Sequence, residues 1–268
     1  MVRPFLARLA AAPCSALILS VPLLIGAATP AGAKGCQAPM QGRYAVMGMG
    51  TVGNPSSTTP QARLLEERWL PGGAVEGRTV ERLGRSLRSG SYRGSVRMVG
   101  TCLVRVERKL PWGQQVSEAV VDGRGRPLYS IDRTPGTVIS SRWLPMASGP
   151  CKVSDLNGVV LSSQVGLNWQ QPSGGWSPNA VVQREQWSEG AVNGVALSSY
   201  GGVGDTASYS GRLQLDPGSC WGGLVEQDAK GVNYTYRALV VNGRGGARGY
   251  LYLQSDPDDL TVGWLVRD

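Results

Sequence analysis

The sequence predicts an all-β protein built from two tandem homologous units, each an antiparallel up-and-down barrel of eight strands. Three observations lead to this prediction. The segment 119–125, Ala-Val-Val-Asp-Gly-Arg-Gly, returns as Leu-Val-Val-Asn-Gly-Arg-Gly at 239–245. The Asp-Gly and Asn-Gly dipeptides tolerate the positive φ angles of tight hairpin turns. No stretch has the apolar spacing of an amphipathic helix, and 38 Gly and 17 Pro interrupt the chain at short intervals.

Further landmarks of the two copies occur in the same order along the chain. Trp69 corresponds to Trp187, and Ser-Tyr-Arg-Gly at 91–94 corresponds to Ser-Tyr-Ser-Gly at 208–211. The separation between matched residues drifts by a few positions between landmarks, which loop insertions in a duplicated fold produce. We therefore expect a first barrel over 34–145, a linker over 146–150 and a second barrel over 151–268.

The first 33 residues have the features of a secretory signal peptide. Arg3 and Arg8 supply the basic start, residues 9–27 are apolar, and Ala-Gly-Ala at 31–33 is a small-residue cleavage site. A membrane anchor is the alternative, but three prolines interrupt this segment and no later segment approaches the length of a spanning helix. We expect a secreted or periplasmic protein that begins at Lys34 and has no membrane span after cleavage.

Four cysteines remain after that cleavage, namely Cys36, Cys102, Cys151 and Cys220. Four cysteines in an exported chain allow three disulfide pairings. The duplication favours Cys36 with Cys102 and Cys151 with Cys220, because only this pairing lets each copy fold alone. In the chain-entropy model each bridge contributes about 4 kcal/mol. The sequence has no C-x-x-C pair and no histidine, so we expect no zinc or other metal site.

In each copy, turn residues separate eight short segments that we expect to be strands. In the first copy the strands are expected at 42–50, 61–70, 75–83, 91–98, 102–110, 114–121, 128–133 and 137–144, with breakers between them at 54–57, 71–73, 84–90, 100, 111–113, 122–125 and 134–136. In the second copy they are expected at 158–169, 179–187, 191–199, 208–215, 221–227, 232–241, 247–254 and 260–266. Short connections place sequential strands side by side.

Alternation within these segments indicates a sheet with one solvated face. Val104 and Val106 lie on one face of segment 102–110, and Arg105 and Glu107 lie on the other. Eight hairpin-linked strands most simply close into a barrel, which removes the exposed sheet edges that favour aggregation. A β-sandwich with crossing connections is the alternative, and glycines within the strands fit either architecture.

The opening of the first strand, Gly42-Arg43-Tyr44, is similar to the G-x-W motif of the calycin-type barrels, the group of lipocalins and avidins, with Tyr in place of Trp. An eight-stranded hairpin series in an exported chain is also their layout. The second copy departs from the motif, with Gly-Val-Val at 158–160, and the later lipocalin motifs are not found. The resemblance implies a barrel that holds one small apolar or amphipathic ligand.

The charge of the chain divides unevenly between the copies. Residues 34–150 contain 17 Lys and Arg against eight Asp and Glu, whereas 151–268 contain eight against 11. A basic face suggests binding to acidic polysaccharide, lipid headgroups or nucleic acid. However, Arg93, Arg97 and Arg105 are spread out with glutamates between them, which favours the solvated side of an ordinary sheet. We expect no nucleic-acid partner.

No catalytic group of residues emerges from the sequence. The absence of histidine removes the commonest general base. Glu66 and Glu67 are adjacent on a strand, so they point to opposite faces and cannot share a substrate. Glu185 lies on the matching strand of the second copy. Asp-Pro-Asp-Asp at 256–259 aligns with a plain turn and lacks the spacing of a calcium loop. We expect no enzyme and no cofactor, although two facing interior carboxylates would indicate a carboxylate-based enzyme.

Aromatic residues supply the candidate ligand contacts. They lie on the two arms of the hairpin around Asn242, with one arginine among them, and are Tyr234, Tyr236, Arg237, Tyr250 and Tyr252. This mixture suits stacking against a sugar ring or a planar ligand, although cross-strand packing is the favoured reading. We therefore expect a non-catalytic binding protein with a small-molecule ligand. The alternative is a structural or interaction protein of the cell envelope or extracellular matrix with solid barrels.

Overall fold

The computed structural model describes residues 36, 40–54, 56–242 and 248–267. The expected signal peptide at 1–33 lies outside these residues. In the described part of the chain, no helix has the length and hydropathy needed to cross a bilayer.

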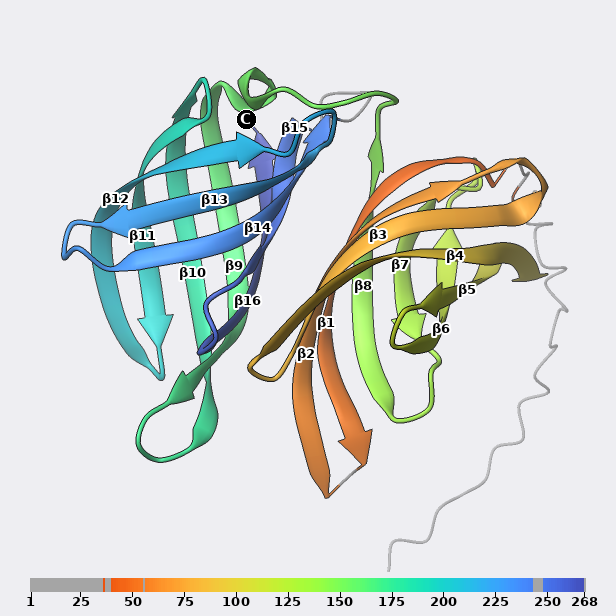
Figure 1. Cartoon of the computed structure of the whole chain (residues 1–268), viewed down its shortest axis with the longest axis horizontal. Helices are drawn as coiled ribbons and strands as arrows, with labels where there is room; N and C mark the ends of the chain where they lie inside the picture. Colours follow the sequence, from red (N-terminus) through yellow and green to blue (C-terminus); the bar gives the residue numbers. More distant parts are fainter. Residues whose placement is uncertain (1–35, 37–39, 55, 243–247, 268) are drawn as a thin grey trace, which may run out of the picture. The chain divides into compact units, whose positions relative to one another are not determined.

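Sixteen strands form two closed antiparallel barrels, which confirms the predicted fold class and rules out the sandwich (Figure 1). The first barrel comprises β1 (Gly42–Asn54), β2 (Ser57–Trp69), β3 (Ala74–Leu83), β4 (Ser86–Gly100), β5 (Leu103–Leu110), β6 (Gly113–Val121), β7 (Pro127–Asp132) and β8 (Thr137–Met146). The second comprises β9 (Gly158–Gln170), β10 (Gly175–Ser188), β11 (Ala191–Tyr200), β12 (Val203–Leu215), β13 (Trp221–Asp228), β14 (Asn233–Asn242), β15 (Arg248–Gln254) and β16 (Asp259–Arg267). Sequential strands pair, and β1–β8 and β9–β16 close the barrels.

Several strands run further than the sequence predicts. β1 continues to Asn54, whose side-chain Oδ1 accepts the backbone N–H groups of Ser56 and Ser57 at 3.0 Å and so forms the turn with few residues. Gly50 allows this extension, because a Cβ there would lie 1.8 Å from the backbone oxygen of Val138. Similarly, β4 begins at Ser86 within the expected 84–90 loop, since Gly84 at φ 54° completes a tighter turn.

Aromatic side chains and a disulfide pack together in the first barrel. Trp69 lies 5.1 Å from Tyr44 and 5.4 Å from Trp143, measured between ring centroids. Cys36 and Cys102 pack against this buried cluster and form a disulfide with their Cα atoms 5.2 Å apart.

The second disulfide joins Cys151 to Cys220, with Cα atoms 4.7 Å apart. Each bridge therefore lies within one copy, as the duplication suggests. Disulfides persist in oxidising compartments, so the two bridges are consistent with an extracellular protein.

The two barrels share apolar core within the compact unit Lys34–Asp268. Outward side chains of the first barrel, such as Met47 and Leu64, belong to the same buried cluster as Leu239 and Leu251 of the second. An isolated first copy would expose this surface. Independent folding of 34–145 and 151–268 stays a prediction.

A tyrosine ring lies across a glycine at equivalent places in both barrels. A Cβ on Gly77 would lie 2.4 Å from Cζ of Tyr92, and a Cβ on Gly194 would lie 2.5 Å from Cζ of Tyr209. The missing side chain lets each ring lie close to the sheet. As a result, each tyrosine hydroxyl reaches across the intervening strand to a buried glutamate two strands away.

We predict that Gly194→Ala destabilises the protein, because the added methyl group forces the Tyr209 ring away from the sheet. Overpacking of this kind costs about 1–3 kcal/mol. Gly204→Ala on β12 is the matched control, since the nearest atom to a Cβ there is the Ser198 backbone oxygen at 3.9 Å. Thermal or urea unfolding of the two variants measures the difference, and equal stabilities would contradict this packing.

Candidate functional site

Each barrel buries one glutamate on its second strand. Glu67 on β2 and Glu185 on β10 are both 0% exposed. Trp69 Nε1 donates a hydrogen bond to Glu67 Oε1 at 2.6 Å, and Trp187 Nε1 donates to Glu185 Oε2 at the same distance. Residues two apart on a strand share a face, so the Glu-x-Trp spacing creates this contact locally.

A tyrosine completes the shared part of the arrangement. The Tyr92 hydroxyl donates to Glu67 Oε2 at 2.7 Å, and the Tyr209 hydroxyl donates to Glu185 Oε1 at 3.1 Å. Both barrels therefore retain the same glutamate, tryptophan and tyrosine in the interior.

The residue facing this arrangement from the fifth strand differs between the barrels. In the first barrel, Trp69 pairs with Val75 on the next strand, Val75 pairs with Gly94, and Gly94 pairs with Arg108. In the second barrel, Trp187 pairs with Val192, Val192 pairs with Gly211, and Gly211 pairs with Glu226. Arg108 and Glu226 thus occupy one structural position. The duplication holds a guanidinium there in one copy and a carboxyl group in the other.

In the first barrel the buried charges neutralise one another. Arg108 Nε donates to Glu67 Oε2 at 2.5 Å, and its other end donates to Ser117 Oγ at 2.6 Å. A second buried ion pair joins Arg63 to Asp132 at 2.7 Å. Buried charges are tolerated when they are paired and hydrogen-bonded in this way. These side chains fill the interior of the first barrel, so it has a structural character.

In the second barrel two carboxyl groups share the interior without a cation. Glu226 is 4% exposed, and neither it nor Glu185 forms an ion pair with any residue that the structure describes. Burial, followed by the charge of Glu185, raises the pKa of Glu226 well above its usual value, and a hydrogen bond with Tyr236 only partly opposes this. Two neighbouring buried carboxyl groups cannot both ionise readily, so this environment favours the protonated form of Glu226.

The hydrogen bonds indicate which of the two groups keeps that proton. Burial raises the pKa of Glu185, but hydrogen bonds from Trp187, Tyr250 and Tyr209 lower it. The Tyr250 hydroxyl lies 3.0 Å from Glu185 Oε2. Donors of this kind stabilise a carboxylate, and Glu226 has fewer of them. We therefore assign the proton to Glu226.

A cavity of about 290 Å³ opens beside Glu226 in the second barrel. An eight-stranded barrel is just wide enough to hold one small ligand. Its wall includes polar and apolar side chains from six strands, β9 to β14, among them Gln164, Val181, Gln183, Ala196, Tyr209, Glu226 and Tyr236. Glu185 does not line the cavity and lies behind Tyr209.

Hydrogen bonds hold the polar wall of the cavity in place. Gln183 Oε1 accepts hydrogen bonds from Ser162 Oγ at 2.5 Å, Gln164 Nε2 at 2.7 Å and the Tyr252 hydroxyl at 3.2 Å. Burial raises the pKa values of Tyr236 and Tyr252, so both side chains stay neutral. A neutral tyrosine hydroxyl donates one hydrogen bond, which Tyr252 gives to Gln183 and Tyr236 gives to Glu226.

The rim of the cavity is acidic. Asp205 and Asp228 lie there, and the Tyr234 hydroxyl contacts Asp228 Oδ2 at 3.3 Å. Lys230 is the one cation among the described residues that line this cavity, and it forms an ion pair with Asp205. The charge of the site therefore disfavours anionic ligands. Across the described residues, no group of Cys, Asp and Glu is arranged to hold a metal ion.

The aromatic residues chosen from the sequence separate into three groups. Tyr234 and Tyr236 line the cavity. Tyr250 and Tyr252 are buried in the hydrogen-bonded wall behind it. Arg237 lies on the opposite face of β14 and pairs with Asp216 at 3.0 Å, because adjacent strand residues alternate in direction. Sequence reasoning missed Glu226, although its correspondence with Arg108 at a matched position was a usable signal.

No family model matches this chain, and no curated protein matches it. One solved structure that it resembles is kievitone hydratase from Nectria haematococca. The alignment covers 88% of this chain and 92% of that chain, with 8% sequence identity and a TM-score of 0.28.

The matched protein is an enzyme, contrary to the prediction of a non-catalytic binding or structural protein. The second barrel also holds the pair of interior carboxyl groups that the sequence analysis associates with a carboxylate-based enzyme. The similarity is too low to indicate a mechanism, so the chemistry must come from the geometry of the second barrel.

We predict that Glu226 makes stability fall with rising pH. The folded protein keeps the Glu226 proton, whereas the unfolded chain loses it above the usual glutamate pKa. Above that pKa the unfolded state binds fewer protons than the folded state, so the free energy of unfolding decreases as the pH rises. Between about pH 5 and about pH 8, the wild type should lose more stability than Glu226→Gln. Urea titrations across this range measure it. The surface variant Glu107→Gln is the control, and parallel curves for wild type and Glu226→Gln would contradict the assignment.

Proposed function

We propose that the second barrel is an acid–base enzyme in which Glu226 carries the proton to and from a small uncharged substrate. One observation carries this proposal. Glu226 lines a cavity and faces Glu185 at the position where the first barrel has a neutralising arginine. A carboxyl group that is protonated at neutral pH beside a ligand cavity is suited to general acid catalysis.

The surrounding side chains have distinct roles in this proposal. Glu226 is the catalytic residue, because it reaches the cavity. Glu185 is a positioning residue, because its charge adds to burial in raising the pKa of Glu226. Tyr209 and Tyr236 line the same cavity; their hydroxyls donate to Glu185 and Glu226 and so hold the two carboxyl groups in place beside it.

Reversible addition of water across an activated double bond fits this arrangement. In the elimination direction, Glu226 donates its proton to the leaving hydroxyl, the C–O bond breaks, and water departs. The resulting Glu226 carboxylate takes the proton from the neighbouring carbon as the C=C bond forms. Glu226 ends protonated, so the buried carboxyl pair keeps the same charge over the cycle.

The substrate class follows from the cavity. The acidic rim disfavours anions, and Val181 and Ala196 supply apolar contact. A volume of about 290 Å³ is at the lower end for ligand pockets. We therefore expect a small, uncharged molecule with a hydroxyl or carbonyl oxygen.

We also propose that this activity operates outside the cytoplasm, in a secreted or periplasmic protein with calycin-like barrels. The residues 1–33, with their signal-peptide pattern, and the two disulfides support this location. The closed eight-stranded order and the Gly-Arg-Tyr opening support the calycin likeness.

We predict that Glu226→Gln lowers turnover by about 10²–10⁴-fold, because the amide cannot donate and recover the proton. The assay presents the protein with a panel of small unsaturated ketones in ¹⁸O-labelled water, and mass spectrometry follows incorporation of the label. Glu107→Gln on the outer face of the first barrel should leave the rate unchanged. Wild-type rates in folded Glu226→Gln would contradict the catalytic role.

A further inference from the structure

The outer surface of the first barrel carries a row of basic side chains along one line of cross-strand partners. Arg43 on β1 lies opposite Arg68 on β2, which lies opposite Glu76 on β3. Glu76 lies opposite Arg93 on β4, and Arg93 lies opposite Lys109 on β5. Adjacent strands are about 4.8 Å apart. Four cations and one carboxylate therefore follow each other across five strands; we call these five residues the basic row.

Two members of the basic row are left without an acidic partner. Arg43 pairs with Glu66 at 2.7 Å, and Arg68 pairs with Glu76 at 3.3 Å. Arg93 and Lys109 are exposed, and neither forms an ion pair with any residue in the described ranges. Like charges directly opposite each other destabilise a sheet. An anion placed between them would remove this repulsion.

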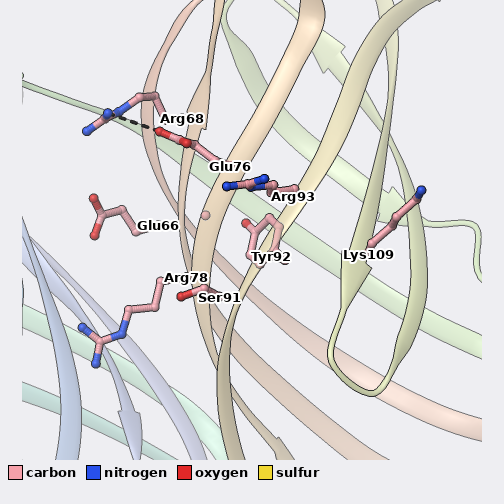
Figure 2. Close-up of a pocket in the computed structure, with 9 residues that line it drawn as sticks. Glu66, Arg68, Glu76, Arg78, Ser91, Tyr92, Arg93 and Lys109 are labelled. Atoms are coloured by element: carbon pink, nitrogen blue, oxygen red, sulfur yellow. Dashed lines mark hydrogen bonds and ion pairs between the residues drawn. The ribbon is translucent and has the colours of Figure 1, made fainter.

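A groove of about 570 Å³ lies over this part of the sheet (Figure 2). Arg68, Glu76 and Arg93 surround it in the view, and Lys109 extends from the neighbouring strand. Gly77 also lines the groove.

The second barrel provides an internal control for this surface. Its equivalent row, traced through the same pairings, is Val159, Gln186, Asn193, Ser210 and Gln227, and it contains no charge. The same architecture therefore forms without charged residues along this line. Arg43, whose side chain is 11% exposed, is held by Glu66 and by the backbone oxygen of Ala147, and Arg68 is held by Glu76. Folding of the barrel does not explain the two remaining cations, Arg93 and Lys109.

We propose that the basic row of the first barrel binds an acidic polysaccharide. Arginine presents a planar fork of donors that matches carboxylate and similar oxyanions, and lysine adds a point charge. A linear chain with repeating anionic groups matches cations that repeat from strand to strand. Single-stranded nucleic acid binding combines charge with exposed aromatic stacking surfaces. The one ring lining the groove, Tyr92, is only 4% exposed, which favours the polysaccharide.

The test uses the full chain and a pair of double variants. Arg93→Ser with Lys109→Gln installs the residues of the second barrel at the two unpaired positions. Arg184→Gln with Arg212→Gln is the control, because it removes two exposed arginines from the second barrel that form no ion pair with described residues. Binding to dextran sulfate, uncharged dextran and oligothymidylate is measured at two salt concentrations.

We expect the wild type to bind dextran sulfate, to bind it more weakly at high salt, and to show no binding to uncharged dextran. The basic-row variant should bind roughly tenfold more weakly, consistent with the loss of two charge contacts, whereas the control variant should bind as the wild type does. Equal weakening in both variants would overturn the proposal, since net charge alone would then explain binding. Absence of wild-type binding, or tighter binding to oligothymidylate, would also overturn it. This surface is separate from the Glu226 cavity, so neither result depends on the proposed catalytic role.

Discussion

A buried carboxylate must be neutralised by an opposite charge or by a proton. The interiors of the two barrels differ in which of these compensates the buried glutamate. Glu67 and Glu185 occupy equivalent positions and keep the same tryptophan and tyrosine donors. In the first barrel Arg108 supplies the opposite charge at 2.5 Å. In the second barrel Glu226 stands in its place, so neutrality requires a proton instead. Glu226 can transfer such a proton to a ligand in the cavity.

The two copies differ in where they place charged residues, both in the barrel interior and on the outer surface. The interior of the first barrel contains buried ion pairs, whereas that of the second has a cavity lined by tyrosines and by the carboxyl group of Glu226. Outside, the first barrel carries the basic row, whereas the equivalent row of the second is uncharged. The shared strand order needs neither feature. The two barrels thus differ most in the surface of the first and the interior of the second.

The fold could be predicted because its signals are local. Hairpin dipeptides, alternating residues and the repeated segment around Asp122 and Asn242 each act over a few positions. Strand ends were less predictable, because the Asn54 turn and the Gly50 close approach depend on partners across the sheet.

The sites were missed for a different reason. Matching the copies emphasised the residues that they share, such as Trp69 and Trp187, whereas the candidate site rests on a residue that they do not share, Glu226. The basic row looks scattered in sequence because Arg68 and Arg93 become neighbours of the same row only through cross-strand register.

The most direct measurement is the protonation state of Glu226 itself. Carbon-13 NMR of protein labelled at the glutamate side-chain carboxyl carbon separates carboxylic acids from carboxylates. At neutral pH we expect a signal from a protonated glutamate that is missing from Glu226→Gln. If every glutamate in the wild type is ionised at neutral pH, the second barrel does not store a proton, and the proposed acid–base chemistry is contradicted.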